Sequence, residues 1–250
     1  MSETKADDGK MRIAKRMARA GACSRREAEG LIGQGRVTLN GKPVETPATL
    51  VDEQDVIAID GEAIEQTAPT ALYRYHKPRG LLTATRDPQG RPTIFDRLPQ
   101  NLPRLMPVGR LDLNSEGLLL LTNDGALKRY LELPETGWAR RYRVRVFGRL
   151  DDQALADLKN GVTIEGIRYG AIDVTIEPGE KANRWLRVGL REGKNREIRK
   201  VLGHVGLEVS RLIRIAYGPF QLGGLKSTEI EQVKGKVLRE QLGSKFPLAA

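Results

Sequence analysis

Four consecutive leucines, Leu118–Leu121, constrain the fold of this chain more than any other feature of its sequence. Such a run is too hydrophobic for an exposed edge strand, because alternate side chains of a strand would then face water. We therefore expect a buried strand here. The stretch Gly109-Arg110-Leu111-Asp112 precedes it as a loop, and a loop held by a buried strand is a suitable place for a functional side chain.

The rest of the chain from Ala71 onward mixes strands and helices. Further strands are predicted at Leu72–His76, Tyr142–Phe147, Ala171–Ile176 and Trp185–Leu190. Helices are predicted at Asp124–Leu133, Asp151–Lys159, Arg196–His204 and Ser227–Val233, with a short one after Lys234. This order has no clean βαβ alternation, so the fold class is predicted to be α+β, with a mixed or antiparallel sheet.

A separate, smaller module is expected over residues 11–64. Its predicted first helix, Met11–Ala20, places four cations on one face: Arg12, Lys15, Arg16 and Arg19. Ser24-Arg25-Arg26-Glu27 has the form of a capping box and predicts the start of a second helix. Asn40-Gly41 tolerates positive φ angles and predicts a hairpin between Arg36–Leu39 and Lys42–Val44. Another strand is expected at Val56–Ile59.

The junction and the two ends of the chain are predicted from composition. Glu62–Thr70 lacks apolar periodicity, and we place a linker at residues 65–71 within and next to it. The second domain is then expected over residues 72–240. Residues 1–10 are expected to be a disordered leader, and residues 241–250 a tail.

Charge and residue usage limit the classes of function. Lysine and arginine total 42 against 32 acidic residues, a net charge of +10, which favours a polyanionic partner; the alternative is a basic protein with no such partner. One cysteine, Cys23, excludes an intrachain disulfide and favours a reducing compartment. With only two histidines, no ordinary zinc site is expected, and no metal or cofactor is predicted. No stretch is apolar enough to span a membrane, so we expect a cytoplasmic protein.

The module at residues 11–64 resembles the S4 RNA-binding domain. The resemblance rests on the basic first helix, the Ser-Arg-Arg-Glu-Ala start of the second helix, and Gly-Arg-Val-Thr-Leu-Asn-Gly at residues 35–41. It implies that Arg12, Lys15, Arg16, Arg19, Arg25 and Arg26 bind RNA. The alternative is a small domain that binds nothing, because basic helix faces are usually solvated.

The second domain resembles the pseudouridine synthases that carry an N-terminal S4 domain. The motifs that carry this resemblance are His76–Gly80, Gly109–Gly117, Leu118–Gly125, Arg141–Val144, Glu192–Lys200, Arg211–Ile215 and Tyr217–Phe220. They occur in the family's order, and together with the S4 module they cover nearly all of residues 11–240. The overall pattern is most similar to the branch that modifies large-subunit ribosomal RNA.

This resemblance implies that Asp112 is the catalytic carboxylate, acting as nucleophile or base while the N1–C1′ bond of a uridine is broken and the base is rejoined through C5. It also implies that Arg199 is the cationic partner of Asp112, since an opposite charge favours the ionised carboxylate. Tyr142 would stack on the flipped base. From the residues alone, Asp112 could equally be a turn residue, Tyr142 a core tyrosine and Arg199 a surface arginine.

The remaining predicted RNA-binding residues flank these positions. Arg110 would hold the RNA backbone or shape its loop, and Lys77 would lie at the pocket wall. Lys194 and Arg196 bracket Asn195, the expected N-cap of a helix whose buried stripe is Ile198, Val201, Leu202 and Val205. Cations at a helix N-terminus oppose the helix dipole by about 0.3–1 kcal/mol each, which is easier to explain if phosphates bind there.

Two other functions stay open at this point: the same chemistry on small-subunit ribosomal RNA, and a non-catalytic S4-type factor that binds ribosomes. The expected partner is ribosomal RNA, either naked or in an assembly intermediate, and the expected oligomeric state is a monomer. The target uridine and the choice between a covalent and a glycal-type route do not follow from the sequence.

Overall fold

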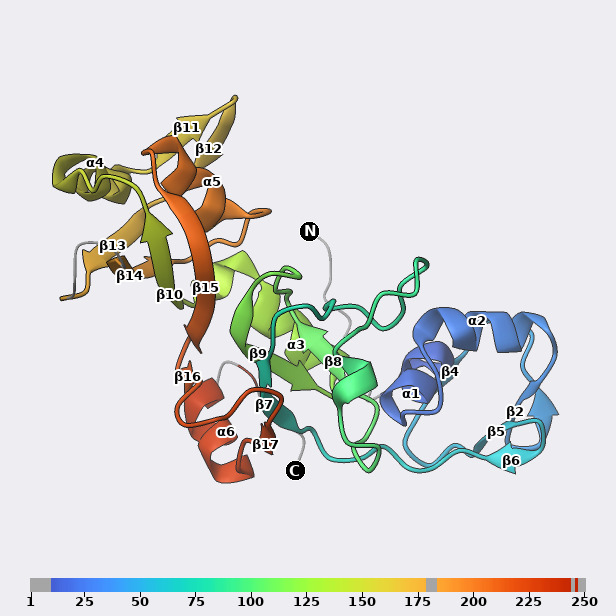
Figure 1. Ribbon diagram of the computed structural model, residues 1–250. Helices are drawn as coiled ribbons and strands as arrows, with labels where there is room; N and C mark the ends of the chain where they lie inside the picture. The colour runs from blue at the N-terminus through green and yellow to red at the C-terminus, as the bar shows by residue number, and fades with distance from the viewer. Residues whose placement is uncertain (1–9, 179–183, 244–245, 247–250) are drawn as a thin grey trace. The chain divides into compact units, whose positions relative to one another are not determined.

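The computed structural model of the chain describes residues 10–178, 184–243 and 246. The chain divides into two compact units, with the boundary between Thr70 and Ala71, and each unit is described by itself (Figure 1). Residues 64–71 have no regular secondary structure. The predicted leader lies outside the described residues except for residue 10, and most of the predicted tail lies outside them as well.

The first unit has the predicted S4-like order of two helices followed by short strands. Its elements are β1 (Met11–Arg12), α1 (Ile13–Arg19), α2 (Arg25–Gly33), β2 (Val37–Leu39), β3 (Lys42–Pro43), β4 (Leu50–Val51), β5 (Ile57–Ile59) and β6 (Glu62–Ala63). One small sheet has the order β3-β2-β5-β6, and β1 pairs with β4. The core includes Ile13, Met17, Ala28, Ile32 and Val37.

Local signals in the first unit explain its turns. The capping box is present, with Ser24 Oγ accepting from Glu27 N at 3.1 Å and the Glu27 carboxylate accepting from Ser24 N at 2.7 Å. Asn40 and Gly41 both have positive φ, 51° and 81°, as a tight hairpin between β2 and β3 requires. The predicted first helix is shorter than expected, because residues 11 and 12 form β1 instead.

The second unit is an α+β domain built on one large sheet. Its first elements are β7 (Leu72–Lys77), η1 (Phe95–Arg97), β8 (Met106–Val108), β9 (Glu116–Thr122), α3 (Gly125–Glu132), η2 (Pro134–Thr136), β10 (Arg140–Phe147), α4 (Asp152–Asp157) and η3 (Leu158–Asn160). Those that follow are β11 (Val162–Ile164), β12 (Ile167–Tyr169), β13 (Ile172–Ile176), β14 (Arg184–Leu190), α5 (Glu197–His204), β15 (Glu208–Tyr217), β16 (Phe220–Gln221), β17 (Ile230–Gln232) and α6 (Gly235–Leu242).

The large sheet has the strand order β13-β14-β10-β15-β9-β7-β17, with β16 paired to β15 and β8 to β9. β15 and β9 pair in parallel, whereas the other pairs are antiparallel. The sheet is therefore mixed, which confirms the predicted fold class. Figure 1 shows β15 running between β10 and β9, where it joins the two halves of the sheet.

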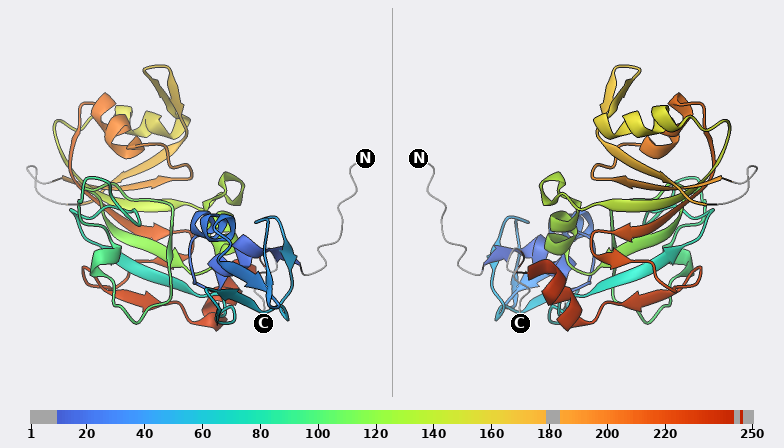
Figure 2. Two further views of the ribbon diagram at one scale, coloured as in Figure 1. Left: turned by 90° about the vertical axis from the view of Figure 1, so that its right-hand side faces the viewer. Right: turned by 90° about the vertical axis from the view of Figure 1, so that its left-hand side faces the viewer.

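Two hydrophobic clusters cover the sheet. One contains Tyr142, Val144, Leu155 and Ile198, and so joins β10 to α4 and α5; Figure 2 shows the yellow α4 and the orange α5 on the same face of the sheet. The other cluster joins β7 and β9 to α3 and α6. All seven residues of β9 are buried, which confirms the buried strand expected from Leu118–Leu121.

In the second unit, β8, β11, β12, β15 and β16 were not predicted, and one strand, β17, stands where a helix was predicted. The expected helix at Ser227–Val233 is instead β17, which pairs with the edge of the sheet at β7, because tertiary pairing outweighs the helix propensity of its glutamates. β15 was not predicted, because Arg214 stands on the buried face of this strand and interrupts its alternation of apolar residues. The Arg214 side chain is 2 % exposed. None of the helices in the described ranges is long and apolar enough to cross a membrane.

Gly117 is the glycine on which the parallel junction of β9 and β15 depends. Its φ is +102°, and an added Cβ would lie 2.3 Å from the carbonyl oxygen of Arg214. We predict that Gly117→Ala lowers the free energy of unfolding by roughly 2–4 kcal/mol, measured by urea denaturation. The matched control is Gly203→Ala in α5, where an added Cβ would meet no atom within 4 Å apart from the backbone of its own helix. This change should be neutral or slightly stabilising. Equal stabilities of the two variants would contradict the prediction.

Candidate active site

The second unit contains a pocket of about 630 Å³ on the face of the sheet that carries Tyr142. This volume lies within the usual range for small-molecule sites, about 300–1,000 Å³. Its walls come from segments that are far apart in the sequence: the loop around Thr83, the loop that contains Asp112, the strands β10 and β15, and residues 193–198. The pocket therefore joins Asp112 and Tyr142, two of the three predicted catalytic residues.

Asp112 lies in the loop between β8 and β9, which is held by contacts from other segments. At the start of the loop, Gly109 N donates to Glu132 Oε1 at 2.6 Å. In the middle, Thr83 Oγ1 donates to the Leu111 carbonyl at 2.9 Å and accepts from Leu111 N at 3.3 Å. These bonds fix the backbone on which the carboxylate stands, so that its position does not depend on the loop alone.

Lys77 is fully buried against the same loop, which corrects its predicted role as an RNA-binding residue. Its Nζ donates to the carbonyls of Pro78 at 2.9 Å, Asp112 at 3.2 Å and Ser115 at 2.9 Å. Three acceptors match the three N–H groups of an ammonium. Burial lowers the pKa of Lys77 to about 8, and the charges of Asp112 and Glu116 oppose this. Lys77 thus clamps the Asp112 loop.

Arg196, and not Arg199, is the arginine paired with Asp112. The Nη1 of Arg196 lies 3.9 Å from Asp112 Oδ2. Arg199 instead donates to the carbonyls of Val209 at 2.8 Å and Asn114 at 3.2 Å. Burial and the nearby Arg196 lower the pKa of Arg199, and Asp112 opposes this. Arg199 therefore contributes to the positive potential near Asp112 and ties down its loop, but the ion pair is made by Arg196.

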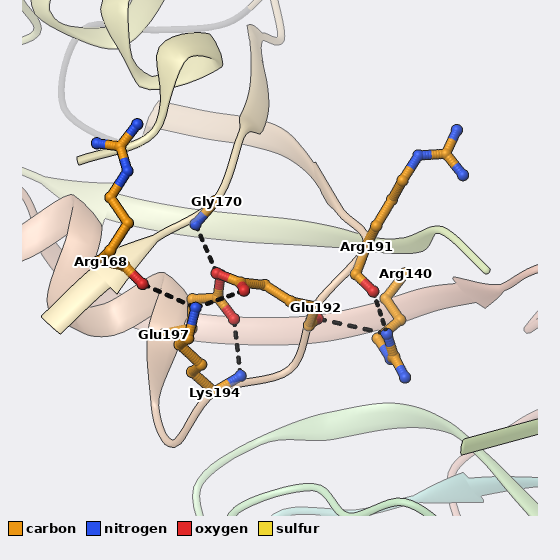
Figure 3. A network of polar contacts seen from close by, with 7 residues as sticks. All are labelled: Arg140, Arg168, Gly170, Arg191, Glu192, Lys194 and Glu197. Carbon is orange, nitrogen blue, oxygen red and sulfur yellow. Dashed lines mark hydrogen bonds and ion pairs between the residues drawn. The ribbon is translucent and has the colours of Figure 1, made fainter. Parts of the chain in front are cut away.

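The turn that carries Arg196 precedes α5. Arg196 is itself the N-cap, with φ 51° and ψ 29°, and no side chain caps the helix; this corrects the predicted N-cap, Asn195. The Glu197 carboxylate accepts from Lys194 N at 2.8 Å and closes the turn (Figure 3). Lys194, Asn195 and Arg196 all line the pocket. The predicted helix stripe is confirmed, with Ile198, Val201 and Leu202 buried and Val205 partly buried.

Tyr142 has 9 % of its surface exposed and shares its strand face with Val144 and Val146. It belongs to the core cluster and also lines the pocket. The core packing thus fixes the ring while one side of it borders the cavity. Arg110 is exposed and lines the pocket too, which places it where RNA would approach Asp112.

The six predicted RNA-binding residues of the first unit differ in exposure. Arg12, Lys15, Arg25 and Arg26 are exposed, Arg19 is partly buried and Arg16 is 7 % exposed. Arg19 Nη2 donates to Thr70 Oγ1 at 2.7 Å. Arg12 belongs to β1 rather than to α1, so the four cations do not form one helix face. Arg16 is buried and is not available for RNA at the surface.

Several charged residues that line the pocket were not predicted from the sequence as site residues, among them Arg214, Arg140 and Glu197. Arg214 is buried, donates from Nε to the Leu118 carbonyl at 2.7 Å, and lines the pocket. Arg140 and Glu197 line it as well. Arg214 lies in β15, which was not predicted. Glu197 stands among lysines and arginines in the sequence, a pattern that is typical of an exposed charged surface. Among the described residues, no cluster of histidine, cysteine and carboxylate side chains could hold a metal.

The fold and the two sequence regions define a class of RNA-modifying proteins. The family model for RNA pseudouridylate synthase matches residues 71–204, and the S4 domain model matches residues 11–57. The chain belongs to the RNA pseudouridine synthase family and is an enzyme of that family with an N-terminal S4 domain.

Its relatives agree in both domains. An uncharacterized RNA pseudouridine synthase of Rickettsia felis is 44 % identical over 92 % of this chain and 99 % of its own length. Ribosomal large subunit pseudouridine synthase B is 42 % identical in Escherichia coli O157:H7, over 92 % of this chain and 82 % of the relative, and 42 % identical in Haemophilus influenzae, over 93 % and 68 %. This confirms the predicted similarity to the branch of the family named for large-subunit ribosomal RNA.

A crystal structure of a pseudouridylate synthase has the same fold. It superposes with a TM-score of 0.64 at 23 % identity, covering 93 % of this chain and all of the other.

The clamp on the Asp112 loop can be tested with Lys77→Met, which keeps an unbranched side chain but removes all three donors. A buried carbonyl left unpaired costs about 1–3 kcal/mol, and of the three bonds only that to Ser115 is fully buried. We therefore expect the free energy of unfolding to fall by about 2–4 kcal/mol and pseudouridine formation to fall at least about 10-fold. Urea denaturation and an activity assay at a temperature where the variant is folded measure both. Lys42→Met, at an exposed hairpin position, is the control. A fully active, stable Lys77→Met protein would rule out the clamp.

Proposed function

We propose that this enzyme isomerises a uridine of ribosomal RNA to pseudouridine, and that the RNA belongs to the large subunit. The support for the substrate is the 42 % identity, across both domains, to proteins named as large-subunit pseudouridine synthase B. The catalytic assignment depends on one observation: Asp112, Tyr142 and Arg196 line the same pocket.

The chemistry needs one carboxylate at the sugar and a fixed place for the base. The N1–C1′ bond breaks, the uracil turns, C5 bonds to C1′, and the proton that leaves C5 is balanced by one gained at N1. Asp112, with its side chain about one-third exposed (34 %), can reach a sugar that enters the pocket. Arg196 places a positive charge 3.9 Å from Asp112, while Tyr142 supplies a ring on which the extruded base can stack.

The positive charges around the pocket would hold the RNA backbone. Arg110, Lys194 and Arg196 line the pocket together with Asp112, and Arg199 interacts electrostatically with Asp112. The exposed cations of the S4 unit supply a second basic surface. Contacts of this kind bind phosphates regardless of sequence. The target uridine would thus be chosen by RNA shape, in naked ribosomal RNA or in an assembly intermediate. We further propose that the enzyme acts in the cytoplasm as a monomer.

The first test is Asp112→Asn. This change removes the ionised carboxylate but preserves shape, so pseudouridine formation should fall by at least about 10³-fold while RNA affinity changes less than about threefold. The assay is tritium release from C5-labelled RNA, with filter binding for affinity. Asp173→Asn, an exposed position of β13, is the matched control. If Asp112→Asn converts RNA normally, the catalytic assignment of Asp112 is wrong and another group of the pocket must supply the chemistry.

Pseudouridine maps of both ribosomal RNAs, with and without the gene, test the substrate. Loss of one site in the large-subunit RNA alone is the expected outcome. Loss of a site in the small-subunit RNA instead would overturn the proposed substrate while leaving the chemistry intact.

The S4 unit is tested with Lys15→Ala/Arg25→Ala, which removes two exposed cations. Each lost phosphate contact should lower the slope of log affinity against log salt by about 0.7 for single-stranded RNA, so weaker binding and a slope smaller by roughly 1.4 are expected. Arg36→Ala is the control, because the charge of Arg36 is already paired with Asp60 at 2.5 Å. Equal salt slopes for both proteins would exclude these two cations from the RNA contact.

A further inference from the structure

Two carboxyl groups meet beside the pocket, those of Glu192 and Glu197 (Figure 3). Glu197, the first residue of α5, is 4 % exposed and lines the pocket. Glu192 is partly buried; its Oε1 accepts from Gly170 N at 2.6 Å and its Oε2 from Lys194 Nζ at 2.5 Å. After burial, a hydrogen bond to Glu192 is the largest cause that raises the pKa of Glu197.

A hydrogen bond between two carboxyl groups requires a proton on one of them, because an ionised carboxylate only accepts. Both oxygens of Glu192 already accept from N–H groups. Glu197 Oε2 accepts from Lys194 N, whereas its buried Oε1 meets no N–H donor in the described structure. The geometry therefore places the proton on Glu197, which donates it to Glu192.

This carboxyl pair closes the turn that carries Arg196. Glu197 N donates to the Lys194 carbonyl at 3.2 Å, and Lys194 N donates back to the Glu197 carboxyl at 2.8 Å. Arg196 lies inside this turn with a φ of 51°, a left-handed conformation that is unfavourable for a residue with a side chain. Such a conformation persists only where the surrounding contacts enforce it. Released from the turn, Arg196 would not stay 3.9 Å from Asp112.

We propose that Glu197 is a positioning residue: protonated and hydrogen-bonded to Glu192, it locks the turn 194–197 and so keeps Arg196 against Asp112. The inference deepens the proposed function and rests on the role given to Asp112 there. Glu197 is not a catalytic residue in this scheme, because it acts on the reaction through Arg196.

The lock is sensitive to pH. The charged groups around the pair are Lys194 and Arg196 on the turn, and Arg140 of β10, whose Nη1 donates to the carbonyls of Arg191 and Glu192 at 2.7 and 3.4 Å. Burial, and then the neighbouring Glu192, raise the pKa of Glu197 to about 7, against the opposing effect of Lys194. Above that pH both carboxyl groups are ionised and repel each other.

The test compares wild type with Glu197→Gln and Glu197→Ala in single-turnover assays between about pH 6 and about pH 8.5. Gln keeps an N–H donor for Glu192 and an oxygen for Lys194 N, so it imitates the protonated acid and should restore most of the activity that Ala loses. The ratio of the Gln rate to the wild-type rate should rise several-fold with pH. Glu177→Gln, whose carboxylate pairs with Arg143 and Arg187 on the other sheet face, should follow the wild-type profile.

Stability gives a second readout that does not depend on Asp112. With a pKa near 7 folded against 4.5 as the ordinary value, the native state holds more protons between these pH values, so wild type loses stability relative to Glu197→Gln as pH rises through this window. The ratio of their unfolding constants should grow on the order of 100-fold. If Asp112→Asn is inactive and the stability of wild type relative to Glu197→Gln falls with pH, both the proposed function and the role of Glu197 are supported. If Asp112→Asn is active and this stability change is present, only the proposed function is contradicted. Identical pH profiles and no shift in relative stability overturn the lock.

Discussion

The buried ammonium of Lys77 is the interaction on which the candidate active site depends. Asp112 stands on an irregular loop, and irregular backbone has no periodic hydrogen bonds to hold it. Lys77 lies at the end of β7 and donates to three carbonyls at 2.9–3.2 Å, two of them in the loop itself. Because β7 pairs along its length with the buried β9, the bonds from Lys77 tie the loop that carries Asp112 to the buried part of the sheet. Burying this charge costs free energy of desolvation, and the three hydrogen bonds that it makes hold the loop in place.

The electrostatic design of the pocket follows from the same arrangement. One carboxylate is surrounded by arginines that come from a different part of the chain, and only Arg196 approaches it to ion-pair distance, 3.9 Å. The pair is loose and about half of the Arg196 side chain is exposed, so the arginine is free to contact a phosphate as well. The neighbouring Glu197 provides the opposite kind of site, a carboxyl group in which burial favours the neutral acid.

Sequence reasoning located the elements whose signals are local. The capping box at Ser24, the hairpin at Asn40-Gly41 and the buried strand of leucines are all present, and Asp112 and Tyr142 do share a pocket. It failed where tertiary contacts decide. Arg214 interrupts the apolar pattern of β15, and Lys77 was predicted to bind RNA although it is fully buried. The family resemblance implied Arg199 as the partner of Asp112, and no local signal in the sequence shows that Arg196 is the arginine that reaches this carboxylate.

The central place of β15 has a consequence for how the protein is made. This strand is synthesised after β7, β9 and β10, yet it lies between β10 and β9 and is the link that joins the two halves of the sheet. A growing chain can form the β7–β9 pairing early, but that half carries Asp112 and the other half carries Tyr142. Catalytic competence therefore requires that β15 has been synthesised, and the long-range parallel pairing at Gly117 is the step expected to limit the rate of folding.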